Sequence, residues 1–461
     1  MTIREQTKIA GDRLREKESS LGRPLTAACI TFGCQMNARD SEKIRGILQE
    51  IGFQLSDTEE ADLVLYNTCT VRDNADRKVY GRLGYLHSLK KKNPKKIIGL
   101  CGCMMQEPHV IEKLRREYPF VNLIFGTHNI EKLPGLVGMA LQEPEEQFIS
   151  ILDDSVEIRE DLPVSRKYAF KAGVNIMYGC NNFCSYCIVP YVRGREKSRK
   201  PEEILEEIRS LTSDGVKEIM LLGQNVNSYG KTLDHPCSFS ELLERIAAVP
   251  DLPRIRFMTS HPKDLSEDLI RTMAAHENIC RHLHLPLQSG SSRILEIMNR
   301  RYTKERYLEL IDRIRDAMPD ISLTTDIIVG FPGETEKDFQ ETLEVVERAR
   351  FDSAFTFLYS KRTGTPAASM PDQIPESVMH ERFDVLLSLV QRIGREQTSR
   401  FTGQVQEVLV ESVNDQLAQY VSGRLSNNTV VHFPGDEALI GKIVPIELTS
   451  CRGFYYIGKR V

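Results

Sequence analysis

The chain alternates apolar runs with amphipathic segments over most of its length, and this pattern predicts an α/β protein. In the first block, each apolar run is followed by a stretch whose apolar residues recur at helical spacing, most clearly over 40–53. The runs cover 25–33, 61–69, 95–103 and 121–126. Short apolar strands separated by helices are typical of a doubly wound parallel sheet. We expect this N-terminal domain to cover residues 24–142.

A second alternating series follows, with six predicted strands and amphipathic helices such as 201–215 and 336–350 between them. The predicted strands are 173–179, 216–225, 254–260, 281–288, 321–331 and 352–360. Six such units predict a partial (β/α)6 barrel over residues 166–397. In barrels of this kind, ligands gather at the C-terminal ends of the strands.

The remaining segments differ in pattern. Residues 1–23 are polar, and we expect a disordered lead there. Residues 143–165 are acidic and irregular, as in a linker. Residues 398–461 contain short β-type runs divided by Asn, Gly and Pro, which predict a small all-β barrel of the oligonucleotide-binding shape. We expect this last block to act as a separable binding module.

Composition narrows the class of protein. A length of 461 residues suggests about three domains, and a net charge of −4 with 27% charged residues indicates no particular partner. Eleven cysteines are too few for a disulfide scaffold in such a chain, so metal binding or catalysis is expected. The N-terminus lacks the apolar core of a signal peptide, and no apolar run approaches the ~18 residues of a spanning helix. We therefore expect a cytoplasmic protein without a membrane partner.

Three cysteines, Cys180, Cys184 and Cys187, lie within eight residues directly after the first predicted barrel strand. Thiolates are soft ligands that suit iron–sulfur clusters or zinc. A structural zinc site normally has four protein ligands, and no Cys or His follows at close spacing. Three thiolates on a cuboidal cluster would leave one iron open for another ligand. The alternative is a tight turn with three core cysteines.

A second set of cysteines is spread along the first block. Cys34, Cys69 and Cys103 each end a predicted parallel strand, so all three can meet at one edge of the sheet. They suggest a second cluster that is also one ligand short. Buried cysteines are common in strands, so three unrelated core thiols are the other interpretation.

The motif "CNNFCSYC" after the first barrel strand resembles the signature of the radical S-adenosylmethionine (SAM) enzymes. Together with the second cysteine set and the closing β block, it resembles the methylthiotransferases, whose C-terminal RNA-binding domain is called TRAM. The resemblance implies two [4Fe–4S] clusters, each with three cysteine ligands. Cys34, Cys69 and Cys103 would hold the auxiliary cluster, and Cys180, Cys184 and Cys187 the radical cluster. It also implies SAM, a tRNA substrate and an electron donor such as a flavodoxin or ferredoxin.

Two stretches, "CIVPYVRGREKSR" and "FLYSKRTGTPAA", most resemble the MiaB branch of this family. That branch inserts a methylthio group at carbon two of dimethylallyl-modified adenosine next to the tRNA anticodon. The alternatives are the branches acting on threonylcarbamoyl-adenosine in tRNA and on a ribosomal-protein aspartate. A non-catalytic RNA-binding protein whose thiolates hold zinc is a rival from another class.

Several strand-end residues are candidates for contacts with SAM. Gln224 and Asn225 end the second barrel strand, and Ser260 and Gln288 occupy similar positions, where strand caps and turns are the alternative. "DIIVGFPGET" resembles the stretch that backs adenine in radical barrels, which adds Val329. No residue is assigned as an acid or base catalyst. The basic residues after the cysteine motif, Arg193, Arg195, Lys197 and Arg199, are predicted to hold RNA.

Overall fold

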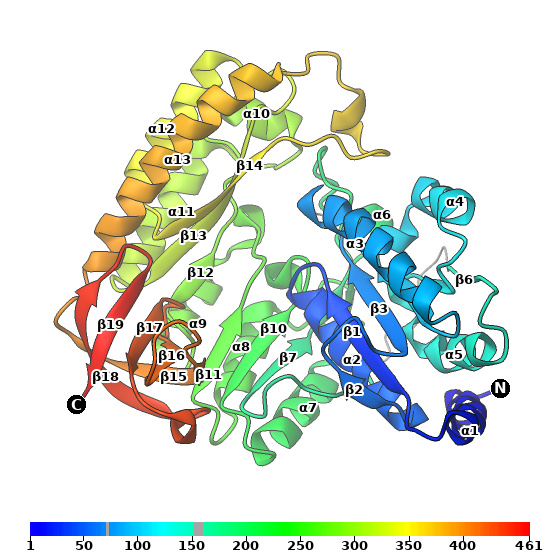
Figure 1. Ribbon diagram of the computed structural model, residues 1–461. Helices are drawn as coiled ribbons and strands as arrows, with labels where there is room; N and C mark the ends of the chain where they lie inside the picture. The colour runs from blue at the N-terminus through cyan, green and yellow to red at the C-terminus, as the bar shows by residue number, and fades with distance from the viewer. Residues whose placement is uncertain (71–72, 152–159) are drawn as a thin grey trace. The chain divides into compact units, whose positions relative to one another are not determined.

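The computed structural model describes residues 1–70, 73–151 and 160–461. These residues form two compact units (Figure 1). The N-terminal unit contains Met1–Lys167 together with Tyr178–Asn181 and Ile188–Glu196. The barrel unit contains Tyr168–Met177, Asn182–Cys187 and Lys197–Val461. The cysteine motif after the first barrel strand is therefore divided between them.

The N-terminal unit is built on a six-stranded parallel sheet with the order β2-β1-β3-β4-β5-β6. Its strands are β1 (Thr26–Thr31), β2 (Gln54–Ser56), β3 (Leu63–Thr68), β4 (Ile97–Gly102), β5 (Leu123–Phe125) and β6 (Phe148–Ser150). Every residue of β3 and β4 is buried, as expected for strands covered on both faces.

Helices cover both faces of this sheet, which confirms the predicted doubly wound arrangement. The helical elements are α1 (Ile3–Leu21), α2 (Gln35–Ile51), α3 (Asp73–Lys92), η1 (Cys103–Gln106), α4 (Pro108–Glu117), η2 (Thr127–Lys132) and α5 (Leu133–Gln142). Residues of α1, α2 and α5 share one apolar core with the sheet, and residues of α3 and α4 share another. The chain order reverses between β1 and β3, and such a switch point is where open α/β sheets bind their ligands.

The N-terminus differs from the expected disordered lead, because residues 3–21 form α1. Thr2 and Glu5 make a capping box at its start, and Ala10 and Leu14 are buried against the rest of the unit. The expected linker over 143–165 also begins with ordered chain, since β6 pairs with β5. Residues 152–159 of that linker lie outside the described residues.

The barrel unit contains six parallel strands that follow one another in chain order, as predicted for a partial barrel. They are β7 (Lys171–Asn175), β10 (Glu218–Leu222), β11 (Arg254–Phe257), β12 (His282–His284), β13 (Ser322–Val329) and β14 (Ser353–Leu358). The sheets β7-β10-β11 and β12-β13-β14 are joined through a parallel bridge between Ile255 and Ile279. No helix in the described ranges is long and apolar enough to cross a lipid bilayer.

Helices pack on the outside of these strands, with α11, α12 and α13 running beside β13 and β14 (Figure 1). The main helices are α7 (Pro201–Ser213), α8 (Phe239–Ala247), α9 (Glu267–Ala275), α10 (Ser292–Ile297), α11 (Lys304–Ala317), α12 (Glu336–Ala349) and α13 (Glu376–Ser399). The shorter elements of this part of the chain are β8 (Met177–Tyr178), α6 (Val189–Val192), β9 (Lys197–Ser198), η3 (Val226–Ser228), η4 (Pro262–Asp264) and η5 (Pro366–Ser369).

The C-terminal block closes into a five-stranded barrel with the order β15-β16-β17-β19-β18. Its elements are β15 (Val405–Val413), β16 (Tyr420–Arg424), β17 (Val430–Pro434), η6 (Glu437–Leu439), β18 (Ile443–Cys451) and β19 (Tyr455–Arg460). Val408, Val431, Phe433 and Tyr456 fill its interior. This closed barrel confirms the predicted small all-β domain of the oligonucleotide-binding shape.

Charged side chains at the N-terminal end of the barrel strands attach this small domain to the barrel. Arg254 donates to the carbonyls of Arg424 and Glu407 at 2.7 and 2.8 Å. Arg256 donates to the carbonyls of Ser426 and Leu425 at 2.8 and 2.6 Å. Both arginines are buried. The C-terminal block therefore packs on the base of the barrel, and its action as a separable module stays a prediction.

Candidate functional site

Three cysteines of the N-terminal unit follow neighbouring strands of its sheet. Cys34 comes after β1 and caps α2, Cys69 directly follows β3, and Cys103 follows β4 at the start of η1. Since β1, β3 and β4 are adjacent and parallel, their C-terminal ends lie together at the switch point. The sequence prediction that these cysteines share one sheet edge is confirmed.

The backbones come close at this edge. A Cβ at Gly33, beside Cys34, would lie 2.9 Å from the Cβ of Cys69, so any larger residue would press on that thiol. Gly102, beside Cys103, has a φ of +97°, and a Cβ there would lie 2.3 Å from the carbonyl oxygen of Thr68. Glycine is required at both positions for the strand ends to meet.

Burial raises the pKa of the Cys103 thiol to about 12, with the charge of Arg193 opposing the rise and the thiols of Cys69 and Cys34 adding to it. Cys69 and Cys34 are therefore near enough to Cys103 to act on its thiol. As they stand, no three or more His, Cys, Asp or Glu side chains in the described ranges are arranged to hold a metal ion. The case for a cluster here consequently rests on donor chemistry and on the shared strand edge, since thiolates are soft ligands that suit iron–sulfur clusters.

Buried polar groups surround these cysteines. Asn37 donates to Asn67 Oδ1 and to the carbonyl of Thr68, and its own Oδ1 accepts from Cys34 Sγ at 3.2 Å. Arg193, from the segment Ile188–Glu196 of the same unit, reaches this Asn37 oxygen at 3.3 Å. The thiols thus lie in a polar frame, although β3 and β4 are otherwise apolar.

Two arginines that the sequence assigned to RNA binding have other partners. Arg193 is buried among Cys103, Asp40 and Asn37, and Arg199 is buried with its guanidinium on Glu207 and the carbonyl of Asn175. Neither side chain is accessible to a phosphate, so this prediction is wrong for both. Arg195 and Lys197 are exposed, and for them it stays a prediction.

The other cysteine motif begins in the N-terminal unit with Cys180. Its N–H donates to the carbonyl of Gly194 at 3.1 Å, and its side chain is buried. Gly179 before it has a φ of +68°, and a Cβ there would lie 2.0 Å from the carbonyl oxygen of Arg195. Only glycine fits where these two segments cross.

Cys184 and Cys187 belong to the barrel unit and form a tight turn, with the Cys187 N–H donating to the carbonyl of Cys184 at 2.9 Å. Asn299 stabilises the turn, since its side chain donates to the carbonyls of Asn182 and Phe183. Arg300, also buried, places Nη1 3.5 Å from Cys184 Sγ. Tyr186 packs partly buried against a cluster that includes Met298 and Phe331.

The C-terminal ends of the barrel strands contain buried polar atoms that lack partners. Among the described residues, Asn225 Oδ1, Ser260 Oγ and Gln288 Oε1 have no hydrogen-bond partner. Thr259 and Gln288 both have a φ of +68°, a strained backbone for residues other than glycine. An unsatisfied buried polar atom costs about 1–3 kcal/mol, so a ligand that pairs with these atoms would recover it. Three of the predicted SAM contacts are therefore placed to bind a polar ligand.

The other two predicted contacts differ. Gln224 follows β10 and is partly buried, next to Asn225. The side chain of Val329 belongs to the core between sheet and helices, and its carbonyl accepts from the N–H of Tyr359 at 2.8 Å. Any contact of Val329 with a ligand would therefore involve backbone, as the positive φ of Gly330 beside it allows.

His261 lies after β11 and joins the strand-end groups. Burial lowers its pKa strongly, so the ring is neutral; Nδ1 accepts from the Lys263 N–H, and Nε2 has no partner among the described residues. The ring meets Tyr302 edge-on at 5.8 Å, and Tyr302 OH accepts from Arg300 Nε at 3.2 Å. Contacts thus connect the strand end at β11 with the sulfur of Cys184.

The inner face of the sheet β12-β13-β14 carries both polar and aromatic side chains. Register places His284 opposite Thr324, and Asp326 opposite Phe355. The alternate residues Leu323 and Ile327 pack with the outer helices. The side chains of the two register pairs therefore face the barrel interior. Phe355 and Phe357, two residues apart on β14, are 49% and 37% exposed.

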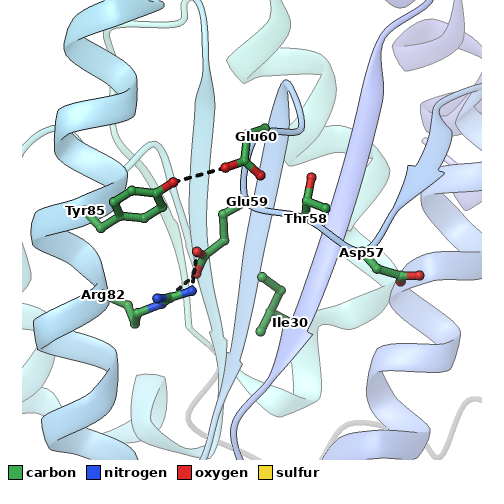
Figure 2. Close-up of a pocket in the computed structure, with 7 residues that line it drawn as sticks. All are labelled: Ile30, Asp57, Thr58, Glu59, Glu60, Arg82 and Tyr85. Atoms are coloured by element: carbon green, nitrogen blue, oxygen red, sulfur yellow. Dashed lines mark hydrogen bonds and ion pairs between the residues drawn. The ribbon is translucent and has the colours of Figure 1, made fainter. Parts of the chain in front are cut away.

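A separate hollow of about 340 Å³ lies on the α3 side of the N-terminal sheet (Figure 2). Arg82 pairs with Glu59, and Tyr85 donates to Glu60 at 3.0 Å, as the dashed lines in Figure 2 show. Because the polar groups of its wall bind one another, this hollow offers a poorer site than the strand ends of the barrel.

Three family models match the chain. Residues 174–346 match the radical SAM superfamily, residues 26–126 match uncharacterized protein family UPF0004, and residues 399–461 match the TRAM domain. A curated relative from Lachnoclostridium phytofermentans, a tRNA-2-methylthio-N(6)-dimethylallyladenosine synthase, is 60% identical over 97% of this chain and 98% of its own length. A synthase of the same name from Thermoanaerobacter sp. is 50% identical over 100% of this chain and 97% of its own.

Among solved structures, the fold is similar to that of a radical SAM methyltransferase, TsrM from Kitasatospora setae, which has cobalamin and a [4Fe–4S] cluster bound. The TM-score is 0.51 at 16% identity, over 75% of this chain and 77% of that one. This likeness concerns the fold.

Proposed function

Since the chain belongs to the family of tRNA-2-methylthio-N(6)-dimethylallyladenosine synthases, we propose that it adds a methylthio group to carbon two of dimethylallyl-modified adenosine in tRNA. The observation that carries this proposal is the 60% identity to such a synthase over nearly the full length of both chains. It favours this branch over those acting on threonylcarbamoyl-adenosine or on a ribosomal-protein aspartate.

Membership of the radical SAM superfamily implies a [4Fe–4S] cluster and SAM. We assign Cys180, Cys184 and Cys187 to that cluster, and Cys34, Cys69 and Cys103 to a second one. The donor sets fit such groups, because each offers three soft sulfurs and a buried arginine near one of them. When bound, SAM and the clusters supply a 5′-deoxyadenosyl radical that can remove an aromatic hydrogen, and the sulfur of the methylthio group.

The strand ends of the barrel supply the contacts that orient SAM. The orphan oxygens of Asn225 and Gln288 accept hydrogen bonds, and they suit the amino group and ribose hydroxyls of SAM. Ser260 Oγ can donate or accept, and the neutral His261 ring presents an N–H at Nε2. These groups are held by the fold before any ligand arrives, so little reorganisation is needed on binding.

The open inner face of the barrel suits a modified base. A flipped-out base stacks on aromatic rings, and Phe355 and Phe357 are the large apolar side chains exposed on β14. The dimethylallyl group is itself apolar, so these rings would recognise the earlier modification. Asp326 and His284 beside Phe355 are polar groups able to meet the edge of the base.

The remaining parts supply RNA contacts and electrons. A TRAM domain with an oligonucleotide-binding barrel shape is suited to single-stranded RNA, and Arg195 and Lys197 are exposed basic groups. Reduction of the radical cluster requires an electron donor, for which a flavodoxin or ferredoxin is suited. Six cluster thiolates require a reducing compartment, which agrees with a cytoplasmic location.

The substrate test is incubation of the iron-loaded protein with SAM, reductant and three candidate substrates in parallel. These are tRNA with dimethylallyladenosine, tRNA with threonylcarbamoyl-adenosine, and the small-subunit ribosomal protein. Mass spectrometry of digests is expected to find the methylthio group in the first tRNA alone. Modification of either other substrate in its place would overturn the branch assignment.

The cysteine assignments are tested by replacing each set of three with alanine. Each variant is expected to retain about four irons per chain, the content of one cubane cluster. The Cys34/Cys69/Cys103 variant should still produce 5′-deoxyadenosine but attach no methylthio group to tRNA. The Cys180/Cys184/Cys187 variant should produce no 5′-deoxyadenosine. A colourless protein containing zinc would instead support the non-catalytic alternative.

A further inference from the structure

Arg193 reaches a proposed ligand of the auxiliary cluster from a distant part of the chain. Its Nε donates to Cys103 Sγ at 2.9 Å, and its Nη1 lies 3.0 Å from Asp40 Oδ2. Nη2 contacts Asn37 Oδ1, the oxygen that also accepts from Cys34 Sγ. One guanidinium therefore touches the surroundings of two of the three proposed ligands.

The burial of Arg193 requires compensating charge. The side chain is 3% exposed, and a guanidinium taken from water needs partners for its positive charge and its five N–H donors. Asp40 supplies one negative charge. The Nε donor points at a sulfur, and a neutral thiol is a weak acceptor, whereas a thiolate bound to iron is a charged one.

The segment that contains Arg193 is fixed to the same place by apolar packing. Ile188 and Val192 form a small buried cluster with Cys103. This segment starts one residue after Cys187, yet it belongs to the N-terminal unit. The chain thus returns from the radical motif to bring a cation to the auxiliary cysteines.

We propose that Arg193 is a positioning residue of the auxiliary cluster, where its N–H···S bond to Cys103 and its charge retain the cluster and raise its reduction potential. The inference rests on the proposed assignment of Cys34, Cys69 and Cys103. A cubane held by three thiolates is negatively charged, and reduction adds to that charge. A fixed cation with a hydrogen bond to sulfur therefore stabilises the reduced state.

Arg300 offers a matched residue at the other cysteine set. It is buried, and its Nη1 lies 3.5 Å from Cys184 Sγ, while its other donors bind Tyr302 OH and the carbonyl of Pro286. If each arginine serves the cluster whose ligand it touches, their replacements will affect different clusters. A general loss of folding would instead affect both.

The experiment uses full-length chains that each retain one cluster. In the variant lacking Cys180, Cys184 and Cys187, Arg193→Gln is expected to speed the loss of iron to a ferrous chelator about 10- to 100-fold. It should also move the midpoint of a dye-mediated redox titration, followed by electron paramagnetic resonance, to lower potential. In the variant lacking Cys34, Cys69 and Cys103, Arg193→Gln should change neither measurement, whereas Arg300→Gln should change both.

Two further variants separate the role of Arg193 from stability. Arg193→Lys keeps the charge and is expected to restore part of the potential. Adding Asp40→Asn to Arg193→Gln removes the unpaired buried carboxylate, so the fold recovers while the potential stays low. Circular dichroism reports the fold in each case.

The outcomes distinguish a failure of the proposed role of Arg193 from a failure of the auxiliary-cluster assignment. If the chain lacking Cys180, Cys184 and Cys187 binds no iron before Arg193 is changed, the auxiliary assignment fails and the inference fails with it. If that chain binds about four irons but Arg193→Gln leaves iron loss and potential unchanged, only the role of Arg193 is overturned. Equal effects in both backgrounds would likewise show a structural role alone.

Discussion

Replacing Arg256 tests how much the contacts between the C-terminal domain and the barrel strands contribute to stability. Its guanidinium is 3% exposed and donates to Glu218 Oε2 at 2.8 Å and to the carbonyls of Ser426 and Leu425. Arg256→Met keeps an unbranched, flexible side chain but removes its charge and all these donors. We expect this substitution to destabilise the barrel unit strongly.

The magnitude follows from the partners left behind. Removing one member of a buried ion pair costs about 3–5 kcal/mol. The lower end applies because Glu218 keeps Lys171 at 3.0 Å. The carbonyls of Leu425 and Ser426, one buried and one partly buried, also lose their donor, at about 1 kcal/mol each. The total is about 5 kcal/mol, a large part of the roughly 5–15 kcal/mol by which a typical domain is stable.

Urea unfolding provides the assay, and far-UV circular dichroism is the signal because the chain contains no tryptophan. With an m-value of about 3 kcal/mol/M, the midpoint should fall by about 1.7 M. Arg245→Met is the matched control, since Arg245 forms a 3.0 Å ion pair with Glu202 in which both side chains are exposed. The control should change the free energy of unfolding by less than about 0.5 kcal/mol.

A second substitution tests the reasoning itself. Glu218→Gln added to Arg256→Met removes a buried carboxylate that has lost Arg256 and keeps only Lys171, so the double variant should be more stable than Arg256→Met alone. If Arg256→Met unfolds within about 1 kcal/mol of Arg245→Met, the buried contacts do not hold the base of the barrel as argued.

Three further predictions concern the same unit. Burial alone would raise the pKa of Glu218, but the charges of Arg256 and Lys171 outweigh burial and lower the pKa to about 2. In acid-unfolding curves, the wild type should therefore lose stability relative to Glu218→Gln as pH falls from about 4.5 towards 2. Removal of residues 398–461 should lower the melting temperature of the remaining barrel and its rate of 5′-deoxyadenosine formation along with tRNA binding; unchanged cleavage of SAM would support a separable module. Phe355→Ala should raise KM for dimethylallyl-tRNA about 10-fold, from stacking worth about 1–3 kcal/mol per base, without changing 5′-deoxyadenosine formation in the absence of tRNA; an unaltered KM would exclude Phe355 from the base site.

The strand ends could be predicted because they depend on local pattern. An apolar run marks a strand, and a cysteine directly after it lies at the strand's end whatever the rest of the chain does. Parallel pairing then brings Cys34, Cys69 and Cys103 to one edge. The helix α1 was also readable in principle, since Thr2 and Glu5 have the spacing of a capping box and Ala10 and Leu14 are four apart.

The roles of individual arginines could not be read in this way. Arg193 and Arg195 belong to one basic run, yet the first is buried and the second exposed. The partners of Arg193 are Asp40 and Cys103, which lie 153 and 90 residues earlier in the chain, so only the tertiary fold distinguishes it from a solvated charge. The same holds for Arg254 and Arg256, whose partners come from the C-terminal block.

The two ends of the barrel strands differ in how completely their polar groups are paired, and this difference has a thermodynamic consequence. At the N-terminal end, buried charges such as Arg256 and Glu218 have partners within the fold. At the C-terminal end, Asn225 Oδ1, Ser260 Oγ and Gln288 Oε1 have none among the described residues. A ligand that pairs with these atoms binds the folded state alone, and at 100 times its Kd it adds about 2.7 kcal/mol of stability. The paired charges at the N-terminal ends of the strands stabilise the fold that positions the unpaired atoms. Pairing of those atoms with SAM should stabilise the barrel unit further.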